Sequence, residues 1–301
     1  MPEPGTDVPD RYPEHLSLFS GRLRSLVASD RAGRKAPLLC GDLTLLEAAL
    51  LLEKASRVVI VTGFLVPDAG KAETDGPPGS VVLGRALALL AKACLIATDP
   101  HCLDVLQACA ESVGGPPVLG VSTAEEILEA CPDCLVFVER LGHARDGCYY
   151  NMRGTDITAW TSPLDRAAGL ARKAGIGVIA IGDGGNEAGM GSLGENLERL
   201  VTPGFRSCLC CVESDICVPV DVSNWGCYAL TALLSGFSRK WLGHSEEEES
   251  AMLESMALQG AVDGATRENT RTVDGFSENE NRKLVEAVRE EFDSFLETAS
   301  S

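Results

Sequence analysis

The stretch "RVVIVTGF", residues 57–64, decides the fold class because β-branched residues follow one another from Val58 to Thr62. A strand that is apolar on both of its faces is typical of a parallel sheet covered by helices on each side. The residues before it, 42–55 ("DLTLLEAALLLEKA"), have a strongly apolar helical pattern. A helix that leads into a buried strand is the repeating unit of α/β proteins.

The same alternation continues along the chain. Helices are expected at residues 79–93, 101–113, 123–130 and 163–174, and strands at 94–99, 117–122, 134–140 and 175–182. Beyond residue 200 the pattern predicts one more strand within 206–222 and three helices, at 224–237, at 245–261 and at the end of the chain. We therefore predict an α/β fold with a mainly parallel sheet, helices on both faces in a Rossmann-like three-layer arrangement, and extra C-terminal helices. Residues 1–39 are expected to form an N-terminal extension with one amphipathic helix, and residues 40–301 a single α/β catalytic domain.

Composition excludes several classes of partner. The chain has 301 residues, 45% of them hydrophobic, and a formal net charge of -18. Such a charge repels a phosphate backbone, so we expect no nucleic-acid partner. No apolar stretch reaches the roughly 18 to 20 residues that a membrane span needs, and the N-terminal residues lack the features of a secretory signal or an Arg-rich transit peptide. These features predict a soluble, cytoplasmic protein with no membrane partner, and they leave the oligomeric state open.

The twelve cysteines do not form a recognisable metal or disulfide pattern. Cys131 and Cys134 form a lone C-x-x-C pair, and the cluster between Cys208 and Cys217 has no histidine at a zinc-site spacing. We expect the thiols to be reduced and mostly to serve as small buried apolar residues.

Unusual residues gather where the predicted strands end. In an open parallel sheet, ligands bind beyond the carboxyl ends of the strands, because loops and helix N-termini meet there. The strand ends of this chain are residues 62–79, 98–101, 139–158, 182–191 and 221–226. Each cluster alone is also explained by turns and helix caps. Together they predict a ligand site at this edge of the sheet.

The glycine-rich stretch "IAIGDGGNEAGMG", residues 179–191, is the densest of these clusters. Glycine loses conformational entropy on ordering, so such a run indicates several positive φ angles or a ligand held against the backbone. The overlapping "GMGSLG" fits the G-x-G-x-x-G pattern of dinucleotide sites, but it begins several residues after its strand instead of at the strand's end. A ligand cradle is therefore favoured over a nicotinamide-binding loop.

Several motifs resemble the catalytic domain of the D-glutamate cyclase family. They are "VVIVTGF", "ETDGPPG", "NMRGTDIT", "IGDGGNEAGMG" and the later "VDG", and the similarity extends from about Cys40 to the last helix. The resemblance implies conversion of D-glutamate to 5-oxo-D-proline and water. It also implies a mitochondrial matrix location, as in vertebrate members that carry an additional upstream domain, which does not precede the motifs in this sequence.

Candidate catalytic residues follow from that reaction, which needs proton transfer and stabilisation of oxyanion charge. We expect carboxylates to carry it, and a divalent cation, Mg²⁺ or Mn²⁺, is a possible cofactor on Asp183 and Glu187. Asp75 has an alternative role as a helix N-cap. The expected catalytic residues are Asp183, Glu187, Asp75 and Glu73.

Candidate substrate-binding residues are expected around the same carboxylates. Backbone amides of the glycine-rich loop are predicted to donate to the oxyanion, and Arg153 or Arg140 to hold the substrate α-carboxylate through a planar fork. The full expected set is Thr62, Gly63, Arg153, Asn151, Gly184, Gly185 and Asn186. Two other functions stay open: a non-catalytic module that binds a nucleotide or an acidic metabolite, and an NAD-dependent oxidoreductase.

Overall fold

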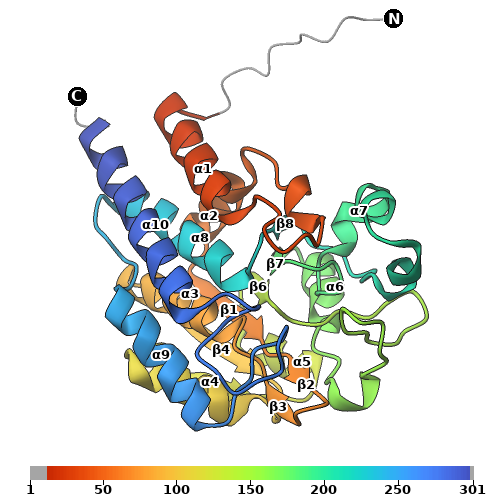
Figure 1. Cartoon of the computed structure of the whole chain (residues 1–301). Coiled ribbons are helices and arrows are strands. Elements are labelled where there is room, and N and C mark those ends of the chain that lie inside the picture. Colours follow the sequence, from red (N-terminus) through yellow and green to blue (C-terminus); the bar gives the residue numbers. More distant parts are fainter. Residues whose placement is uncertain (1–11, 299–301) are drawn as a thin grey trace, which may run out of the picture.

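Six parallel strands form the central sheet of the protein, in the order β5-β4-β1-β6-β7-β8 (Figure 1). A computed structural model describes residues 12–298 of the chain. The strands are β1 (Arg57–Thr62), β4 (Ala93–Thr98), β5 (Val118–Gly120), β6 (Cys134–Val138), β7 (Gly177–Gly182) and β8 (Ile216–Pro219). The winding reverses between β1 and β6, which are neighbours in the sheet. Ligand sites of open α/β sheets lie at such a reversal, beyond the carboxyl ends of the strands.

Alternate residues of each strand face opposite sides of the sheet, which explains the continuous apolar run in β1. Val58 and Ile60 pack into the larger core cluster, and Val59 and Val61 into a second cluster on the other face. Both faces are thus buried under helices, and the predicted α/β fold with helices on both faces is confirmed.

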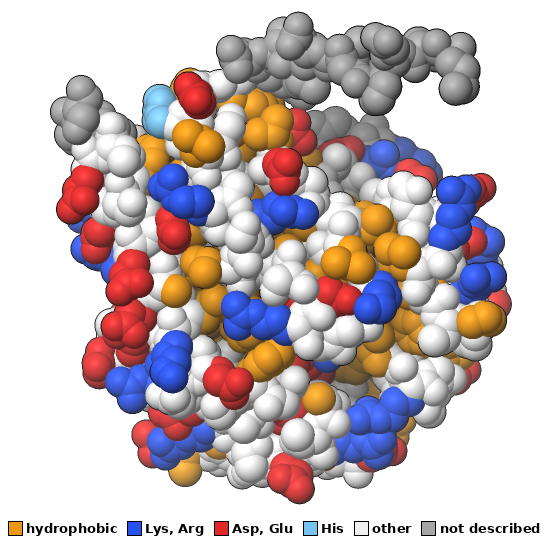
Figure 2. Space-filling view, turned by 45° about the horizontal axis from the view of Figure 1, so that its top comes forward, with side chains coloured by type: hydrophobic (Ala, Val, Ile, Leu, Met, Phe, Trp, Pro, Cys, Tyr) orange, Lys and Arg blue, Asp and Glu red, His pale blue; other side chains and the backbone are white. Residues whose placement is uncertain are grey.

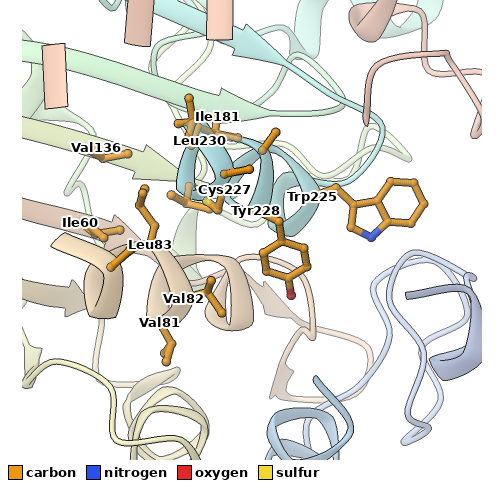
Figure 3. Packing of buried hydrophobic residues seen from close by; sticks show 14 of the residues in the cluster. Ile60, Val81, Val82, Leu83, Val136, Ile181, Trp225, Cys227, Tyr228 and Leu230 are labelled. Atoms are coloured by element: carbon orange, nitrogen blue, oxygen red, sulfur yellow. The ribbon is translucent and has the colours of Figure 1, made fainter. Parts of the chain in front are cut away.

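The larger core lies under helices from both ends of the chain. Figure 3 shows Ile60, Val136 and Ile181 of the strands facing side chains of α3 and α8. α1 and α10 lie side by side although they come from opposite ends of the sequence (Figure 1). The helices of this layer are α1 (Glu14–Val27), α2 (Thr44–Lys54), α3 (Pro77–Leu89), α4 (Leu103–Ser112), α8 (Ser223–Ser238), α9 (Glu246–Leu258) and α10 (Glu278–Thr298).

The opposite face of the sheet is covered by two shorter helices, α5 (Ala124–Glu129) and α6 (Arg166–Lys173). A two-stranded antiparallel hairpin, β2 (Leu65–Val66) and β3 (Lys71–Ala72), follows β1, and α7 (Gly194–Leu200) follows the glycine-rich loop. Between these elements lie short 3-10 helices: η1 (Ala36–Leu39), η2 (Thr158–Trp160), η3 (Gly191–Leu193) and η4 (Pro203–Cys208). Within residues 12–298, none of the helices has both the length and the apolar character to cross a membrane.

The predicted boundary at residue 40 stays a prediction. The helix α1 buries Phe19, Leu23 and Val27 in the larger core and contacts α2, α8 and α10. The amphipathic helix expected in the N-terminal segment is therefore present and packs on the body of the protein. On the face seen in Figure 2, acidic and basic side chains are interspersed, and hydrophobic side chains are exposed between them.

Candidate active site

A cavity of about 240 Å³ lies beside the carboxyl ends of β1 and β6. Its walls come from distant parts of the chain, including the loop before α2, the hairpin after β1, the loop after β6 and two Asp-Gly turns before α10. The lining residues are Arg34, Phe64, Val66, Pro67, Glu73, Glu139, Asn151, Met152, Arg153, Gly264, Ala265 and Asp274. Because three of these carry carboxylates and two are arginines, the cavity suits a small polar ligand.

Three carboxylates converge next to this cavity. Asp75, Glu139 and Asp183 each place one oxygen so that all three oxygens lie within 4.8 Å of one another. All three residues are buried, and they follow β3, β6 and β7 respectively. Buried carboxylates this close together repel one another unless protons or a cation neutralise them.

Asp75 is held by backbone amides at the start of α8. Its Oδ1 accepts from the amides of Gly76 and Asn224, both at 2.9 Å, and its Oδ2 accepts from the amide of Ser223 at 2.9 Å. Burial raises the pKa of Asp75 from 3.8 to about 8, although the three amides favour the ionised form. The capping role considered for Asp75 thus takes a different form, since the helix that it contacts is α8 and not the α3 that follows it in sequence.

Glu139 adopts a left-handed backbone conformation at the end of β6, with φ of +42°. Such a conformation is uncommon for a residue with a side chain and is found at functional sites. Its Oε2 accepts a hydrogen bond from the Ser223 hydroxyl at 2.6 Å. Burial, together with the nearby Glu187, Asp75 and Glu73 carboxylates, raises its pKa well above the ordinary value.

Asp183 forms an ion pair with Arg34, and Arg34 also pairs with Asp274 at 2.9 Å. Asp183 is fully buried, and the side chain of Arg34 is 17% exposed. Burial raises the pKa of Asp183 well above its ordinary value, while the Arg34 guanidinium acts in the opposite direction. Arg34 therefore brings a positive charge from the N-terminal segment into the group of acids.

Glu73 also lines the cavity. It is 6% exposed, and burial together with the charge of Asp274 raises its pKa well above the ordinary value. Its backbone amide donates to the Phe64 carbonyl at 2.9 Å, a hydrogen bond that connects the loop after β3 to the residues just after β1. Of the four predicted catalytic acids, the structure brings Glu73, Asp75 and Asp183 together around the cavity.

Glu187, the fourth predicted catalytic acid, turns back onto its own loop. Its Oε1 accepts from the amide of Gly184 at 2.9 Å, and its Oε2 accepts from the amide of Gly185 at 2.7 Å. Two amides of the loop that was predicted to donate to an oxyanion are thus bonded to Glu187. Asp183 forms the three-oxygen group together with Asp75 and Glu139, and Glu187 is not part of that group.

Packing of the protein interior explains why residue 185 is a glycine. Its φ is +105°, and a Cβ built on it would lie 2.6 Å from Leu197 Cδ2 and 2.7 Å from Leu209 Cδ2. Those two leucines belong to a small apolar cluster with Met190. A Gly185→Ala variant would therefore disturb the packing of these leucines, whether or not Gly185 contacts a ligand.

The remaining predicted substrate-binding residues fall into two groups. Asn151 and Arg153 line the cavity, where Arg153 Nη2 donates to the Ala265 carbonyl at 2.9 Å. Two others are buried: Thr62 is the last residue of β1, and Asn186 lies in the glycine-rich loop, where its Nδ2 donates to the Tyr150 carbonyl at 2.9 Å.

Arg140 is committed to structural contacts. It is 1% exposed, forms an ion pair with Asp99 at 2.7 Å, and donates to the carbonyls of Gly63 at 2.8 Å and Ser162 at 2.6 Å. Because both terminal nitrogens of Arg140 are engaged in these bonds, its guanidinium is not free for the predicted two-point contact with a substrate carboxylate. Gly63 has φ of +113°, and its carbonyl is occupied by this arginine.

Three residues of the site were not singled out from the sequence. Glu139 stands at a strand end that was recognised, and Asp274 belongs to the quoted "VDG" type of motif, so both carried a detectable signal. Arg34 carried none, because it lies in a polar segment far from the strand ends. Its partners Asp183 and Asp274 are distant in sequence.

The sequence matches the family described as "D-glutamate cyclase-like, C-terminal" over residues 23–289. It is 36% identical over 270 residues to the Homo sapiens protein named "D-glutamate cyclase, mitochondrial", a match that covers 77% of this chain and 44% of that protein. The chain thus spans less than half the length of this relative.

A crystal structure of an exopolyphosphatase-related protein from Bacteroides fragilis is similar with a TM-score of 0.41 and 11% identity, covering 85% of this chain and 58% of that chain. This likeness is too distant to bear on function. The family match, in contrast, spans most of the sequence and includes every acid around the cavity. The protein therefore belongs to the D-glutamate cyclase-like family, and its sequence matches the part of that family described as C-terminal.

Proposed function

We propose that the protein converts D-glutamate to 5-oxo-D-proline and water, as a carbon–oxygen lyase of the hydro-lyase type. Family membership and the name of the human relative support this activity. The same relative is named mitochondrial, which supports a mitochondrial location for this protein as well, and we propose the matrix as its compartment. Because the chain spans 44% of that relative, the activity of this region alone is part of the proposal.

The observation that carries the proposal is the cavity itself. Its volume of about 240 Å³ is below the roughly 300–1,000 Å³ of pockets for larger ligands, so it suits a small substrate. Arginines and carboxylates share its walls, as expected for a ligand with both a cationic and an anionic group. An acidic amino acid has this combination of charges.

A divalent cation fits the three converging carboxylates. Their oxygens are the ligand type that Mg²⁺ and Mn²⁺ prefer, and Asp183 Oδ1 is buried without a hydrogen-bond partner among the described residues. We therefore assign a proposed cation to Asp75, Glu139 and Asp183, in place of the pair Asp183 and Glu187. When bound, such an ion would act as a Lewis acid on a substrate carboxyl group.

Ring closure needs the α-amino group in its neutral form, next to the γ-carboxyl carbon. The new C–N bond forms while the bond from the γ-carbon to one γ-oxygen breaks. Counted from the ammonium form, the nitrogen loses two protons in all, and the departing oxygen gains two and leaves as water. Glu73 lines the cavity and is the proposed group that takes protons from the nitrogen and passes them to the departing oxygen. Arg153 is the proposed partner of the α-carboxylate, through those of its N–H groups that Ala265 does not engage.

An NAD-dependent reaction has less support. The glycine pattern "GMGSLG" is closely packed, because a Cβ at Gly191 would lie 2.6 Å from the Val212 carbonyl oxygen and 2.7 Å from the Cys211 carbonyl carbon. A dinucleotide site needs glycine backbone that is open to the pyrophosphate. This glycine approaches the protein's own chain instead.

Incubation of the protein with D-glutamate and with L-glutamate, followed by chiral chromatography, tests the proposal. We expect loss of D-glutamate with equal formation of 5-oxo-D-proline, and addition of EDTA lowers the rate if the assigned cation takes part. Binding of D-glutamate with no product over long incubation would instead support a non-catalytic module for an acidic metabolite.

A further inference from the structure

Two carboxylates on the cavity wall each keep one oxygen without a partner. Glu73 Oε1 and Asp274 Oδ2 are buried and form no hydrogen bond within the part of the chain that the structure describes. Glu73 is 6% exposed, and the side chain of Asp274 is also 6% exposed. Buried acceptors are normally satisfied, so these two oxygens indicate a donor supplied by a ligand.

The two carboxylates meet above Gly264. A Cβ built on this glycine would lie 2.3 Å from Glu73 Oε2 and 3.8 Å from Asp274 Oδ1. Gly264 also lines the cavity, and its backbone does not have a positive φ. The Glu73 carboxylate therefore packs against the backbone of Gly264, with the Asp274 carboxylate near the same point, and a side chain at residue 264 would displace Glu73.

The position of Asp274 is fixed by a tight turn. Asp274 and Gly275 have φ of +53° and +81°, and Val273 and Phe276 exchange backbone hydrogen bonds of 3.0 and 2.9 Å. The amide of Gly275 donates to Asp263 Oδ2 at 2.8 Å, which connects this turn to the preceding Asp-Gly turn. The turn thus holds the Asp274 side chain at the cavity before any ligand arrives.

The nearby cations leave these oxygens available. Arg34 pairs with Oδ1 of Asp274, at 2.9 Å, and not with Oδ2. Arg153 donates to a backbone carbonyl at the rim of the cavity. A ligand that carries several N–H donors on a positive nitrogen would satisfy both acids at once, and a primary ammonium has three such donors.

We propose that Glu73 and Asp274 form an ammonium subsite that receives the α-amino group of an acidic amino acid. The identity of that amino acid rests on the proposed function, whereas the subsite requires only a primary ammonium. Cyclisation replaces the ammonium by a neutral lactam with one N–H donor, so the same subsite holds the product less tightly than the substrate. The two acids therefore determine specificity for the amine and favour release of the product.

Two ligands that cannot cyclise through a γ-carboxyl group test this subsite: D-homocysteate, the γ-sulfonate analogue of D-glutamate, and 4-sulfobutanoate, which lacks the amine. Calorimetry on the full chain gives the two dissociation constants. We expect D-homocysteate to bind at least about tenfold more tightly, because charge-assisted hydrogen bonds to both acids are lost with the amine. Equal affinities, or no binding of D-homocysteate, would overturn the subsite.

Two variants locate the preference within the protein. Asp274→Asn removes the charge, and Gly264→Ala places a methyl group between the acids without changing any charge; each should reduce the preference to within about twofold. The matched control is Gly204→Ala, since a Cβ at Gly204 meets nothing within 4 Å and φ there is not positive. A preference retained in both site variants would contradict the assignment.

The outcome for the subsite is independent of catalysis. Amine preference without formation of 5-oxoproline would refute the proposed cyclase activity and leave the subsite in place. Formation of 5-oxoproline without amine preference would refute the subsite and leave the activity.

Discussion

At the scale of single residues, Glu187 shows how a correct position can be assigned a different role. The residue lies in the expected glycine-rich loop, yet both of its carboxylate oxygens accept amides of that loop. This geometry explains why a buried acid is retained beside Gly184 and Gly185, since it satisfies two buried donors. A role in proton transfer stays a prediction, and the structure adds a structural role beside it.

Glu187→Gln should consequently lower stability as well as turnover. The variant keeps one acceptor but turns an NH₂ group toward the other amide, so we expect a loss of about 1–3 kcal/mol in the free energy of unfolding. Urea denaturation measures it. The control is Glu195→Gln on the exposed surface of α7, where we expect little change. Unchanged stability with a large loss of kcat would favour the original assignment of Glu187 to proton transfer.

At the scale of elements, the segment between α1 and α2 contributes an arginine side chain, Arg34, that faces the buried acids. Arg34 comes from this segment and contacts the ends of two other elements, through Asp183 after β7 and Asp274 before α10. Without it, these acids would face one another in a buried environment with no opposing charge from this part of the chain. The N-terminal segment thus completes the site and does more than cover the core.

Arg34→Met should destabilise the protein strongly in the absence of divalent cations. Removing one partner of a buried ion pair costs about 3–5 kcal/mol, because the remaining charges lose their compensation. Denaturation at pH 8 with EDTA measures this loss. Lys35→Met is the matched control, since Lys35 pairs with Asp30 but is 44% exposed, and it should change stability little. Similar effects of the two substitutions would show that the Arg34 pairs do not stabilise the fold.

At the scale of the whole molecule, the fold followed from sequence more completely than the site. Apolar runs and their spacing predict a parallel sheet, because strand burial on both faces leaves a local signature. Strand ends also pointed to Asp75 and Asp183. The contacts of Arg34, Asp274 and Glu187 did not follow, because they depend on long-range packing and on the direction of single side chains, for which no local pattern exists.

The grouping of buried acids predicts a stability that depends on pH. In the folded protein the pKa of Asp75 is raised to about 8, so between about pH 4 and pH 8 the folded state binds more protons than the unfolded state. The free energy of unfolding therefore falls as the pH rises through this interval. The raised pKa values of Glu73, Glu139 and Asp183 act in the same direction.

Urea denaturation with EDTA at pH 5 and pH 8, on the wild-type protein and on Asp75→Asn, measures this effect. The wild type should lose more stability than the variant between the two pH values, and Mg²⁺ or Mn²⁺ should offset part of that loss at pH 8 if the assigned cation binds. An equal pH dependence in both proteins would show that Asp75 titrates at its ordinary value.

We propose that D-glutamate is converted in the acidic cavity beside Asp183. The most direct measurement is kcat for 5-oxoproline formation by Asp183→Asn and by Asp165→Asn, at equal concentrations of folded protein. Both aspartates are fully buried, but Asp165 binds His143 and Tyr149 outside the cavity. We predict that Asp183→Asn lowers kcat by about 10²-fold or more while Asp165→Asn keeps most of it. Equal kcat values for the two variants, or full activity of Asp183→Asn, would contradict the account.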